Sequence, residues 1–303
     1  MTTRVRPFRF AIAATSAASR EEWTAKARRA EELGYDVFLM PDHTGRQLSP
    51  VPALMAVADA TTRLRIGSFV FANDFRHPLM LAKEIATLDV LSGGRLEFGI
   101  GAGWAPRDYE RIGISYDRPG VRIERMVEAI RLLKRLFAEE AVDFTGKHYR
   151  AKGARLSPRP IQRPHPPLMI GGGGPRILSI AAREADIVAF VPQVDPQGRH
   201  KLSDVTGGAT AAKVARVRKA AGERYARLEI QGFVIDADVG GVAAQAKRLA
   251  LAALDTPYFL YGSVRQVAHD LVRRRERLGI SYYPIPDRAM ESFAPVVAAL
   301  RGR

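Results

Sequence analysis

Short apolar runs alternate along the chain with longer segments whose apolar residues recur every three or four positions. The short runs are typical of buried strands, and the longer spacing is typical of helices that bury one face. Eight runs predict strands: Phe8–Ala14, Val37–Met40, Leu64–Phe71, Leu96–Ile100, Leu168–Ile170, Asp186–Val191, Leu228–Asp236 and Ser281–Ile285. Strands that alternate with helices over short connections indicate a parallel sheet.

Helices are expected in most of the intervals between these strands. The first interval has clear end signals, with Ser19 as the N-cap, Glu22 as its capping-box partner and Gly34 as the stop. The other expected helices cover residues 52–61, 77–91, 106–137 with a break near 113–120, 175–184, 209–222, 242–254, 264–278 and 290–300. Eight strands, most of them followed by a helix, predict an α/β fold of the (β/α)8 TIM-barrel class. The alternative, a doubly wound open sheet, does not usually need eight strands.

One stretch departs from this alternation. Residues 143–167 are rich in Gly, Pro and basic residues, and the strand–helix pattern resumes directly after them. We therefore expect an insertion at about residues 139–167, between the fourth and fifth strands. The insertion would belong to a single domain that spans residues 1–303.

Composition excludes several classes of protein. The chain has 303 residues, and its hydrophobic content of 47% is ample for a large core. It has no cysteine, which excludes disulfides, thiolate nucleophiles and cysteine metal sites. No run approaches the ~18 apolar residues that a membrane helix needs, and the basic N-terminus leads into a short strand without a secretory leader. We expect a soluble, cytoplasmic protein.

The formal net charge of +15 has three possible explanations: nucleic acid, an anionic small molecule, or an arginine-rich surface. The basic residues lie mostly on polar faces of the predicted helices, and aromatic residues are not interleaved with them. That pattern disfavours nucleic-acid binding. An acidic ligand stays attractive, because a positive field raises its local concentration.

Polar and glycine-rich groups follow several of the predicted strands. The chemistry of a TIM barrel sits at the carboxyl ends of its strands. The candidate site residues at these ends are Asp42, His43, Asn73, Gly101, Ala102, Gly103 and Trp104. His43 is the candidate for general acid–base work, against the alternative of a hydrogen-bonded loop histidine. The alternating glycines leave room for a flat ring or a phosphate against the main chain.

A second glycine run predicts an anion site. Gly171, Gly172, Gly173 and Gly174 precede a helix that begins near Pro175, and Arg176 follows. Exposed amides and the helix dipole favour an anion there, and Arg176 would add a charged contact. No Gly-Lys-Ser/Thr follows, so we expect a cofactor phosphate that is not hydrolysed. The alternative is a flexible glycine linker.

The sequence disfavours both a metal site and the active site of a serine hydrolase. The six histidines are dispersed without a His-x-x-x-His or carboxylate cluster, so no metal site is expected. The Gly-x-Ser-x-Gly elbow of a serine hydrolase is also absent.

Taken together and in order, these motifs resemble the luciferase-like monooxygenase superfamily. The shared pieces are Glu31 to Asp36, Pro41 to His43, Leu64 to Ser68, His77-Pro78, Ala86 to Asp89, Leu91 to Arg95, Gly99 to Trp104, Pro160 to Gln162, His165 to Pro167 and Gly171 to Gly174. The match covers most of the chain and is weakest at residues 195–208 and after Leu254.

The resemblance implies a barrel that binds coenzyme F420, or alternatively FMN, at its carboxyl mouth. Asp42 and His43 would lie near the ring, with His43 handling a proton. The Ser68–Phe69 bond would be a non-prolyl cis peptide behind the ring. Gly101 to Trp104 would line the site, and Gly171 to Gly174 with Arg176 would hold the phosphate. A homodimer is the family-like expectation.

One departure from the family pattern bears on the substrate. The glucose-6-phosphate dehydrogenases of this superfamily carry Glu where this chain has Trp104, and Trp near Gln47. This argues against sugar-phosphate oxidation. The basic surface suits the anionic tail of F420, so we expect F420H2-dependent reduction of an activated C=C or C=N bond in a small metabolite. The alternatives are an FMN-dependent monooxygenase and a non-catalytic barrel that binds an anionic partner or nucleic acid.

Overall fold

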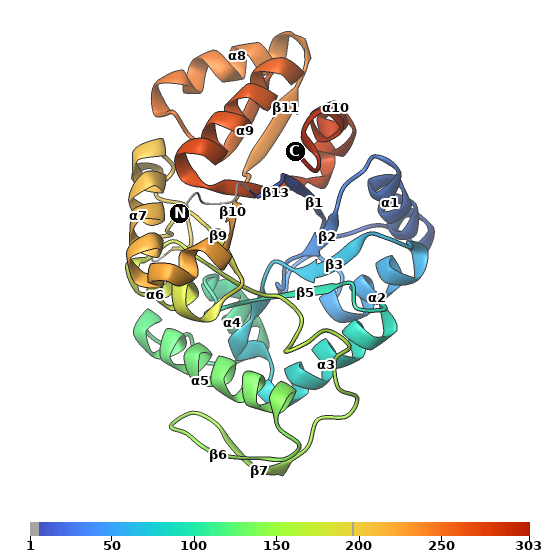
Figure 1. Ribbon diagram of the computed structural model, residues 1–303, viewed down its shortest axis with the longest axis vertical. Coiled ribbons are helices and arrows are strands. Elements are labelled where there is room, and N and C mark those ends of the chain that lie inside the picture. Colours follow the sequence, from blue (N-terminus) through green and yellow to red (C-terminus); the bar gives the residue numbers. More distant parts are fainter. Residues whose placement is uncertain (1–5, 196) are drawn as a thin grey trace.

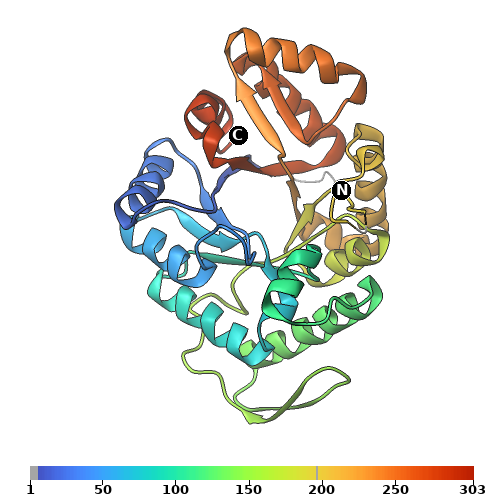
Figure 2. The ribbon, with the colours of Figure 1, turned by 180° about the vertical axis from the view of Figure 1, so that it is seen from behind.

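Eight parallel strands form a closed barrel in the computed structural model, which describes residues 6–195 and 197–303 (Figures 1 and 2). The barrel strands are β1 (Arg9–Ala13), β2 (Val37–Met40), β3 (Arg65–Ser68), β5 (Leu96–Gly101), β8 (Leu168–Gly172), β9 (Ile187–Phe190), β10 (Glu229–Gly232) and β13 (Ile280–Pro286). The pairing of β13 with β1 and of β3 with β5 closes the sheet. The predicted TIM barrel is confirmed. Residues 1–5 and 196, which the domain prediction includes, lie outside the described residues.

The helices cover the outside of the barrel (Figure 1). They are α1 (Arg20–Glu32), α2 (Pro50–Ala60), α3 (Pro78–Leu91), α4 (Pro106–Ile112), α5 (Pro119–Ala138), α6 (Pro175–Glu184), α7 (Gly207–Ala221), α8 (Gly241–Leu251), α9 (Val264–Leu278) and α10 (Met290–Leu300). Ser19 caps α1 as predicted, by accepting the Glu22 N–H at 3.2 Å. The Glu22 carboxylate instead accepts the Ala18 N–H at 2.7 Å, so the predicted capping box is not reciprocal.

Two of the predicted strands end earlier than the apolar pattern indicates. The run Leu228–Asp236 leaves the barrel after Gly232, and a separate strand, β11 (Asp236–Val239), pairs in parallel with β12 (Phe259–Gly262) outside it. The run Leu64–Phe71 breaks after Ser68, and β4 (Phe71–Ala72) resumes beside β5.

Among the described residues the non-prolyl cis peptide bond is Phe69–Val70, one residue beyond the predicted Ser68–Phe69 bond, so that prediction is wrong. The Phe69 N–H still donates to the Met40 carbonyl oxygen at 2.8 Å. The ladder between β2 and β3 therefore extends through Phe69, and the chain departs from it one bond later.

The insertion between the fourth and fifth barrel strands is an antiparallel hairpin of β6 (Val142–Thr145) and β7 (Arg150–Ala154) that projects from the barrel (Figure 1). The carboxylate of Glu128 holds the turn of this hairpin against α5. Glu128 of α5 accepts the backbone N–H groups of Lys147, His148 and Tyr149 at 3.1, 3.0 and 2.7 Å. A Cβ on Gly146 would lie 1.9 Å from a Glu128 carboxylate oxygen, so the turn has room for glycine alone.

Charged residues fill the amino end of the barrel interior. Arg9 donates to the carboxylates of Glu97 and Glu229, the latter at 2.6 Å, and Arg65 donates to Glu97 at 2.9 Å. Burial raises the pKa of Glu229 although Arg9 opposes that shift. Beside these charges the interior side chains are mostly apolar, with the buried Gln231 of β10 as a polar exception. The apolar ones are Ala11, Val37, Leu39, Met169, Ile187, Ala189 and Tyr282.

The side chain of Val70 closes this apolar layer, because Gly99 and Gly101 leave space for it. A Cβ on Gly99 would lie 2.5 Å from Val70 Cγ1, and one on Gly101 would lie 2.8 Å from Val70 Cγ2. A Cβ on Gly171 would lie 3.5 Å from Val70 Cγ1. A Cβ on Gly103, which has φ +73°, would lie 2.0 Å from the Tyr109 hydroxyl. The space that the sequence interpretation left open for a ligand at Gly101 and Gly103 is filled by the protein's own side chains.

We expect Gly101→Ala to destabilise the protein by about 1–3 kcal/mol, because the new methyl group overlaps Val70. Urea denaturation measures this. Combining the change with Val70→Ala removes the overlap, so the double variant should lose less stability than the sum of the two single variants. Gly208→Ala is the matched control, since no atom lies within 4 Å of its Cβ position. Strict additivity of the two changes would contradict this packing account.

Candidate active site

Five rings from different parts of the chain form a continuous arc after the carboxyl ends of the barrel strands. Neighbouring ring centroids lie 5.4, 6.3, 5.9 and 5.8 Å apart in this order: His43, Trp104, His200, Phe233, Phe69. The Trp104 side chain is 45% exposed, so the arc presents an open aromatic surface. Such a surface can stack on or flank a flat conjugated ring.

His43 is held by Asp108, which the sequence analysis missed. His43 Nδ1 lies 2.6 Å from one carboxylate oxygen of Asp108. Thr44 donates its N–H and its hydroxyl to the other oxygen at 3.1 and 2.7 Å. Burial of Asp108 raises its pKa, but the hydrogen bonds from His43 and Thr44 outweigh burial and hold the pKa below its usual value. Asp108 lies in the first turn of the helix that follows Trp104, and that acidic first turn was the available signal.

The ionised Asp108 fixes the orientation of the His43 ring. Because an ionised carboxylate only accepts hydrogen bonds, the proton between the two groups resides on Nδ1. The His43 ring meets Trp104 edge to face, at an interplanar angle of 88°. His43 Nε2 is therefore the ring nitrogen that can accept or donate a proton at the mouth of the barrel.

Asp42 does not orient His43. Its carboxylate accepts from the Arg76 guanidinium at 2.5 Å and from the Ala72 N–H at 3.0 Å, and its side chain is buried. Arg76 also pairs with Glu84 at 3.1 Å. The ion pair with Arg76 neutralises Asp42, and the hydrogen bond from the Ala72 N–H fastens the segment after β2 to β4. Asp42 is therefore a buried residue that stabilises the backbone near the mouth.

Ser68 and Asn73 are also buried away from the mouth. The Ser68 hydroxyl accepts the Gly99 N–H at 2.8 Å and donates to the Gly99 carbonyl oxygen at 2.9 Å. Asn73 donates to Asp74 at 3.0 Å and to the Tyr149 hydroxyl at 3.1 Å. Of the predicted residues around β3, only Phe69 joins the aromatic arc.

Arg122 positions the segment from Ala102 to Trp104, and the sequence analysis missed it. Its guanidinium is buried, donates to the carbonyl oxygens of Gly103 at 2.5 Å and Ala102 at 3.4 Å, and lies 3.9 Å from the Tyr116 ring centroid. The Tyr116 hydroxyl donates to the Trp104 carbonyl oxygen at 3.0 Å. These contacts hold Trp104 at the mouth.

The second glycine run lies where two helices begin. Gly171 and Gly172 end β8, and a Cβ on Gly173 would lie 2.2 Å from the Val191 carbonyl oxygen. Gly174 is the N-cap of α6, and nothing lies within 4 Å of its Cβ position. Arg176 is exposed and donates to the Gly120 carbonyl oxygen in the first turn of α5 at 3.2 Å. The open side of Gly174 and the charge of Arg176 suit an anion.

The loop between β9 and α7 covers part of Trp104. A Cβ on Gly198 would lie 3.6 Å from the Trp104 ring, and the His200 ring stacks beside it at 25°. The base of the loop is anchored by a buried ion pair, in which Lys213 Nζ lies 2.6 Å from Asp204. Lys213 also donates to the Tyr258 hydroxyl at 3.0 Å.

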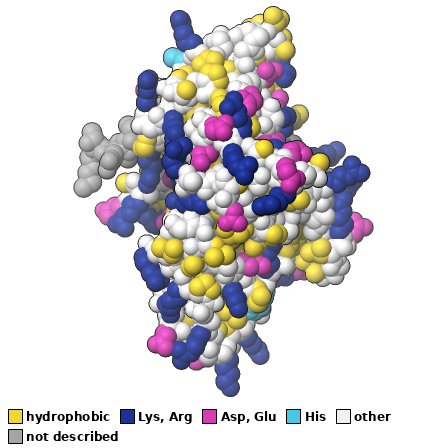
Figure 3. Space-filling model, turned by 90° about the vertical axis from the view of Figure 1, so that its right-hand side faces the viewer, with side chains coloured by type: hydrophobic (Ala, Val, Ile, Leu, Met, Phe, Trp, Pro, Cys, Tyr) yellow, Lys and Arg dark blue, Asp and Glu magenta, His cyan; other side chains and the backbone are white. Residues whose placement is uncertain are grey.

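The described residues hold no group of three or more acidic or histidine side chains suited to a metal ion. Among these residues, no helix is long and apolar enough to cross a membrane. On the face seen in Figure 3, Lys and Arg side chains are dispersed among acidic and apolar ones. The homodimer, the single domain and the cytoplasmic location stay predictions.

The sequence pattern of the luciferase-like monooxygenase family matches residues 5–253. An F420-dependent glucose-6-phosphate dehydrogenase of Microbacterium testaceum is 33% identical over 176 residues, which are 55% of this chain and 52% of the relative. The chain thus spans about half the length of that curated relative.

Two solved structures share the fold over nearly the whole chain. The monooxygenase RslO1 of Streptomyces bottropensis has a TM-score of 0.75 and 24% identity, with 96% of this chain and 99% of that chain covered. The coenzyme F420-dependent tetrahydromethanopterin reductase of Methanopyrus kandleri has a TM-score of 0.76 and 17% identity, with 97% and 100% covered.

We expect Asp108→Asn to reduce stability most at neutral pH. The folded-state pKa of Asp108 is depressed, so its stabilising contribution is present above the ordinary Asp pKa of ~3.9 and is lost as pH falls through the lowered value. The stability gap between wild type and variant should therefore shrink between pH 5 and pH 3. Urea denaturation at both pH values measures it, with Asp59→Asn on the exposed face of α2 as the control. A gap that stays constant down to pH 3 would contradict the role of ionised Asp108.

Proposed function

This chain belongs to the luciferase-like monooxygenase family, and from that premise we propose that it is a coenzyme F420-dependent oxidoreductase. The observation that carries the proposal is the His43–Asp108 pair against Trp104 at the mouth of the barrel. The relative named as F420-dependent, matched at 33% identity, supports F420 over FMN. The expected reaction is reduction of an activated C=C or C=N bond of a small metabolite by F420H2.

The residues at the mouth fit a bound deazaflavin. The aromatic arc offers an apolar surface for a flat ring. The N-terminus of α6 offers backbone N–H groups beside Gly174, where no atom fills the space in front of the N-cap. Arg176 adds a positive charge for a phosphate and for an anionic tail.

A bound deazaflavin supplies hydride transfer and does not readily activate oxygen. The protein's contribution to such a reaction is binding, orientation and proton handling. His43 holds or donates a proton at Nε2, because Asp108 occupies Nδ1. Trp104 and the loop carrying His200 flank this side of the mouth.

The side chain at position 104 bears on the substrate. Trp104 brings no ionisable group to the mouth, and Gln47 donates to the backbone carbonyl oxygens of Pro41 and Leu48 at 2.9 and 3.3 Å. An apolar, unsaturated substrate suits this surface better than a sugar phosphate does.

The first test is a binding titration of the purified protein with F420 and, in parallel, with FMN. We expect F420 to bind and FMN to bind much more weakly. Gly174→Asp should weaken F420 binding at least tenfold, because the new carboxylate repels a phosphate at a position where its side chain has space. Gly174→Ser is the matched control, since Ser is an equally good N-cap without the charge. Tight FMN binding with oxygen consumption would establish the monooxygenase instead, and binding of neither cofactor would refute both.

A second test concerns the proton. His43→Gln should lower the turnover of F420H2 with α,β-unsaturated ketones by about 10²–10⁴-fold, while F420 affinity changes by much less. Steady-state kinetics and the titration above give the two values. His77→Gln, at the exposed start of α3, is the control. Unchanged turnover in His43→Gln would remove His43 from the mechanism.

A further inference from the structure

Exposed large apolar side chains are concentrated on the segments around the mouth. Twelve such side chains are exposed among the described residues. Six of them lie on three segments that follow β2, β5 and β9, and together they form the apolar rim: Leu48, Trp104, Ile112, Ile114, Tyr116 and Leu202. Single exposed apolar side chains are normal on a protein surface, but a group of them on neighbouring segments indicates a binding surface.

The three segments are in contact with one another. The hydroxyl of Thr44, in the segment after β2, donates to Asp108 of α4 at 2.7 Å. A Cβ on Gly198, in the segment after β9, would lie 3.6 Å from the Trp104 ring. In Figure 2, α4 (green) lies in front of the barrel strands. The apolar rim therefore belongs to one connected region beside the aromatic arc.

The part of the apolar rim between α4 and α5 is held in place by hydrogen bonds. The Ile114 N–H donates to the Tyr109 carbonyl oxygen at 3.1 Å, and the Tyr116 hydroxyl donates to the Trp104 carbonyl oxygen at 3.0 Å. Ile112, Ile114 and Tyr116 are nevertheless 42%, 37% and 37% exposed. An apolar surface that is already held in place can bind an apolar ligand at a low cost in conformational entropy.

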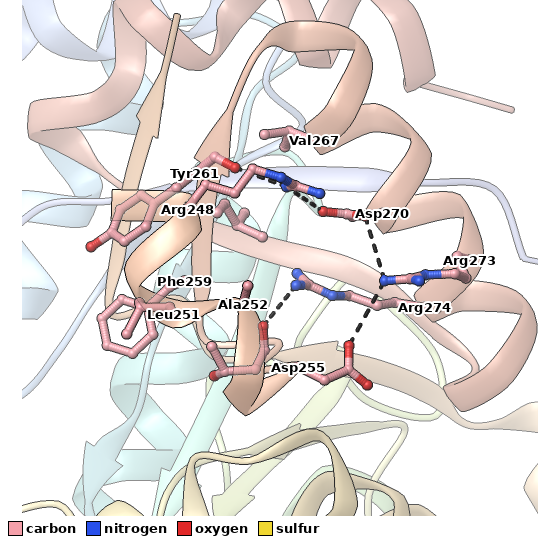
Figure 4. A pocket seen from close by; sticks show the side chains of 12 residues that line it. Arg248, Leu251, Ala252, Asp255, Phe259, Tyr261, Val267, Asp270, Arg273 and Arg274 are labelled. Carbon is pink, nitrogen blue, oxygen red and sulfur yellow. Dashed lines mark hydrogen bonds and ion pairs between the residues drawn. The ribbon is translucent and has the colours of Figure 1, made fainter. Parts of the chain in front are cut away.

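The cavity outside the barrel does not extend this surface. It lies between α8, β12 and α9, has a volume of about 150 Å³, and shares no lining residue with the aromatic arc or the apolar rim (Figure 4). Its charged side chains pair with one another, as in the contact of Arg248 with Asp270 at 2.6 Å. A molecule bound at the aromatic arc can therefore extend over the apolar rim, but not into this cavity.

The occupant of the apolar rim has to leave the mouth usable. Trp104 belongs both to the aromatic arc and to the apolar rim, so whatever covers the rim lies directly beside the arc. A protein partner or a second copy of the chain on Trp104 would obstruct the entry of substrate. A substrate whose reacting group lies at the arc covers the rim only while it is bound.

We propose that the substrate carries an extended apolar chain next to its activated double bond, and that this chain binds along the apolar rim. The inference rests on the proposed function, because it takes the aromatic arc as the place of the reaction. Each methylene group that leaves water contributes to affinity, so longer chains bind more tightly. The arc thus selects the reacting group, and the rim selects the length of the chain.

Binding of saturated ketones tests the apolar rim without cofactor or turnover. The chain has two tryptophans, and Trp23 is 2% exposed whereas Trp104 is 45% exposed, so acrylamide quenching of the fluorescence reports on Trp104. The probes are diethyl, ethyl butyl and ethyl hexyl ketone. The concentration that protects Trp104 should fall about twofold for each added methylene, because a methylene on an open surface loses part of its contact with water.

A double variant locates the chain. Ile112→Ser combined with Ile114→Ser should weaken the binding of ethyl hexyl ketone about fivefold and that of diethyl ketone much less, because only the longer chain reaches these positions. Both side chains are exposed, so the fold does not depend on them. Leu249→Ser, at a 77% exposed position of α8, is the matched control and should change neither value.

Turnover should follow the same order in the protein with F420H2. In this reaction an alkyl vinyl ketone takes up a hydride from F420H2 at its β-carbon and a proton at its α-carbon, which gives the saturated ketone and F420. The value of kcat/KM should rise from ethyl to butyl to hexyl vinyl ketone, and the double variant should lose most of that rise. Reduction of all three ketones at the same kcat/KM would contradict the proposal.

Ketone binding that does not depend on chain length, or a dependence that persists in the double variant, would overturn the proposal. So would the absence of protection by every ketone, and protection of Trp104 by phosphatidylcholine vesicles alone would then assign the surface to a membrane. The binding experiment contains no cofactor. A failure of F420 to bind would therefore refute the proposed function without changing the measured dependence on chain length.

Discussion

The close approach of Val70 to the glycines of two neighbouring strands is the contact on which the site depends. Val70 follows the cis peptide bond, and its methyl groups occupy the space that side chains at Gly99 and Gly101 would fill. The barrel interior is thereby closed just below the mouth. The same segment presents Phe69 to the aromatic arc. A packing requirement inside the barrel thus determines where the aromatic surface begins.

The candidate functional groups at the mouth are held in place by residues that do not themselves lie at the mouth. Asp108 holds His43, Arg122 holds the backbone before Trp104, and Asp42 joins the segment after β2 to β4 by accepting the Ala72 N–H. The buried pair of Lys213 and Asp204 anchors the loop that carries His200. Each ring of the arc belongs to a different segment of the chain. The shape of the mouth is therefore determined by several separate contacts. A preorganised site of this kind needs little rearrangement on ligand binding.

The barrel could be predicted from sequence because its signals are local. Each strand is an apolar run, and the carboxyl-end rule alone brings His43 and Trp104 to one face. The partners of these residues could not be predicted in the same way. Asp108 and His43 are 65 residues apart in the sequence, and Arg76 and Asp42 are 34 residues apart. Both contacts therefore depend on how the loops fold. The sequence interpretation assigned the space at Gly101 and Gly103 to a ligand, and only the structure shows that their Cβ positions lie against Val70 and Tyr109.

The turn of the hairpin β6–β7 is attached to α5 through backbone groups. Glu128 binds three consecutive N–H groups, and Gly146 is the one hairpin position at which a side chain would collide with that carboxylate. Main-chain N–H groups are the same in every residue except proline. The side chains of Lys147 and His148 take no part in these three hydrogen bonds, so these two turn positions can diverge during evolution while the position of the turn on α5 is retained. A segment of this kind can acquire new surface properties, such as a different charge or a new contact, without change to the barrel beneath it.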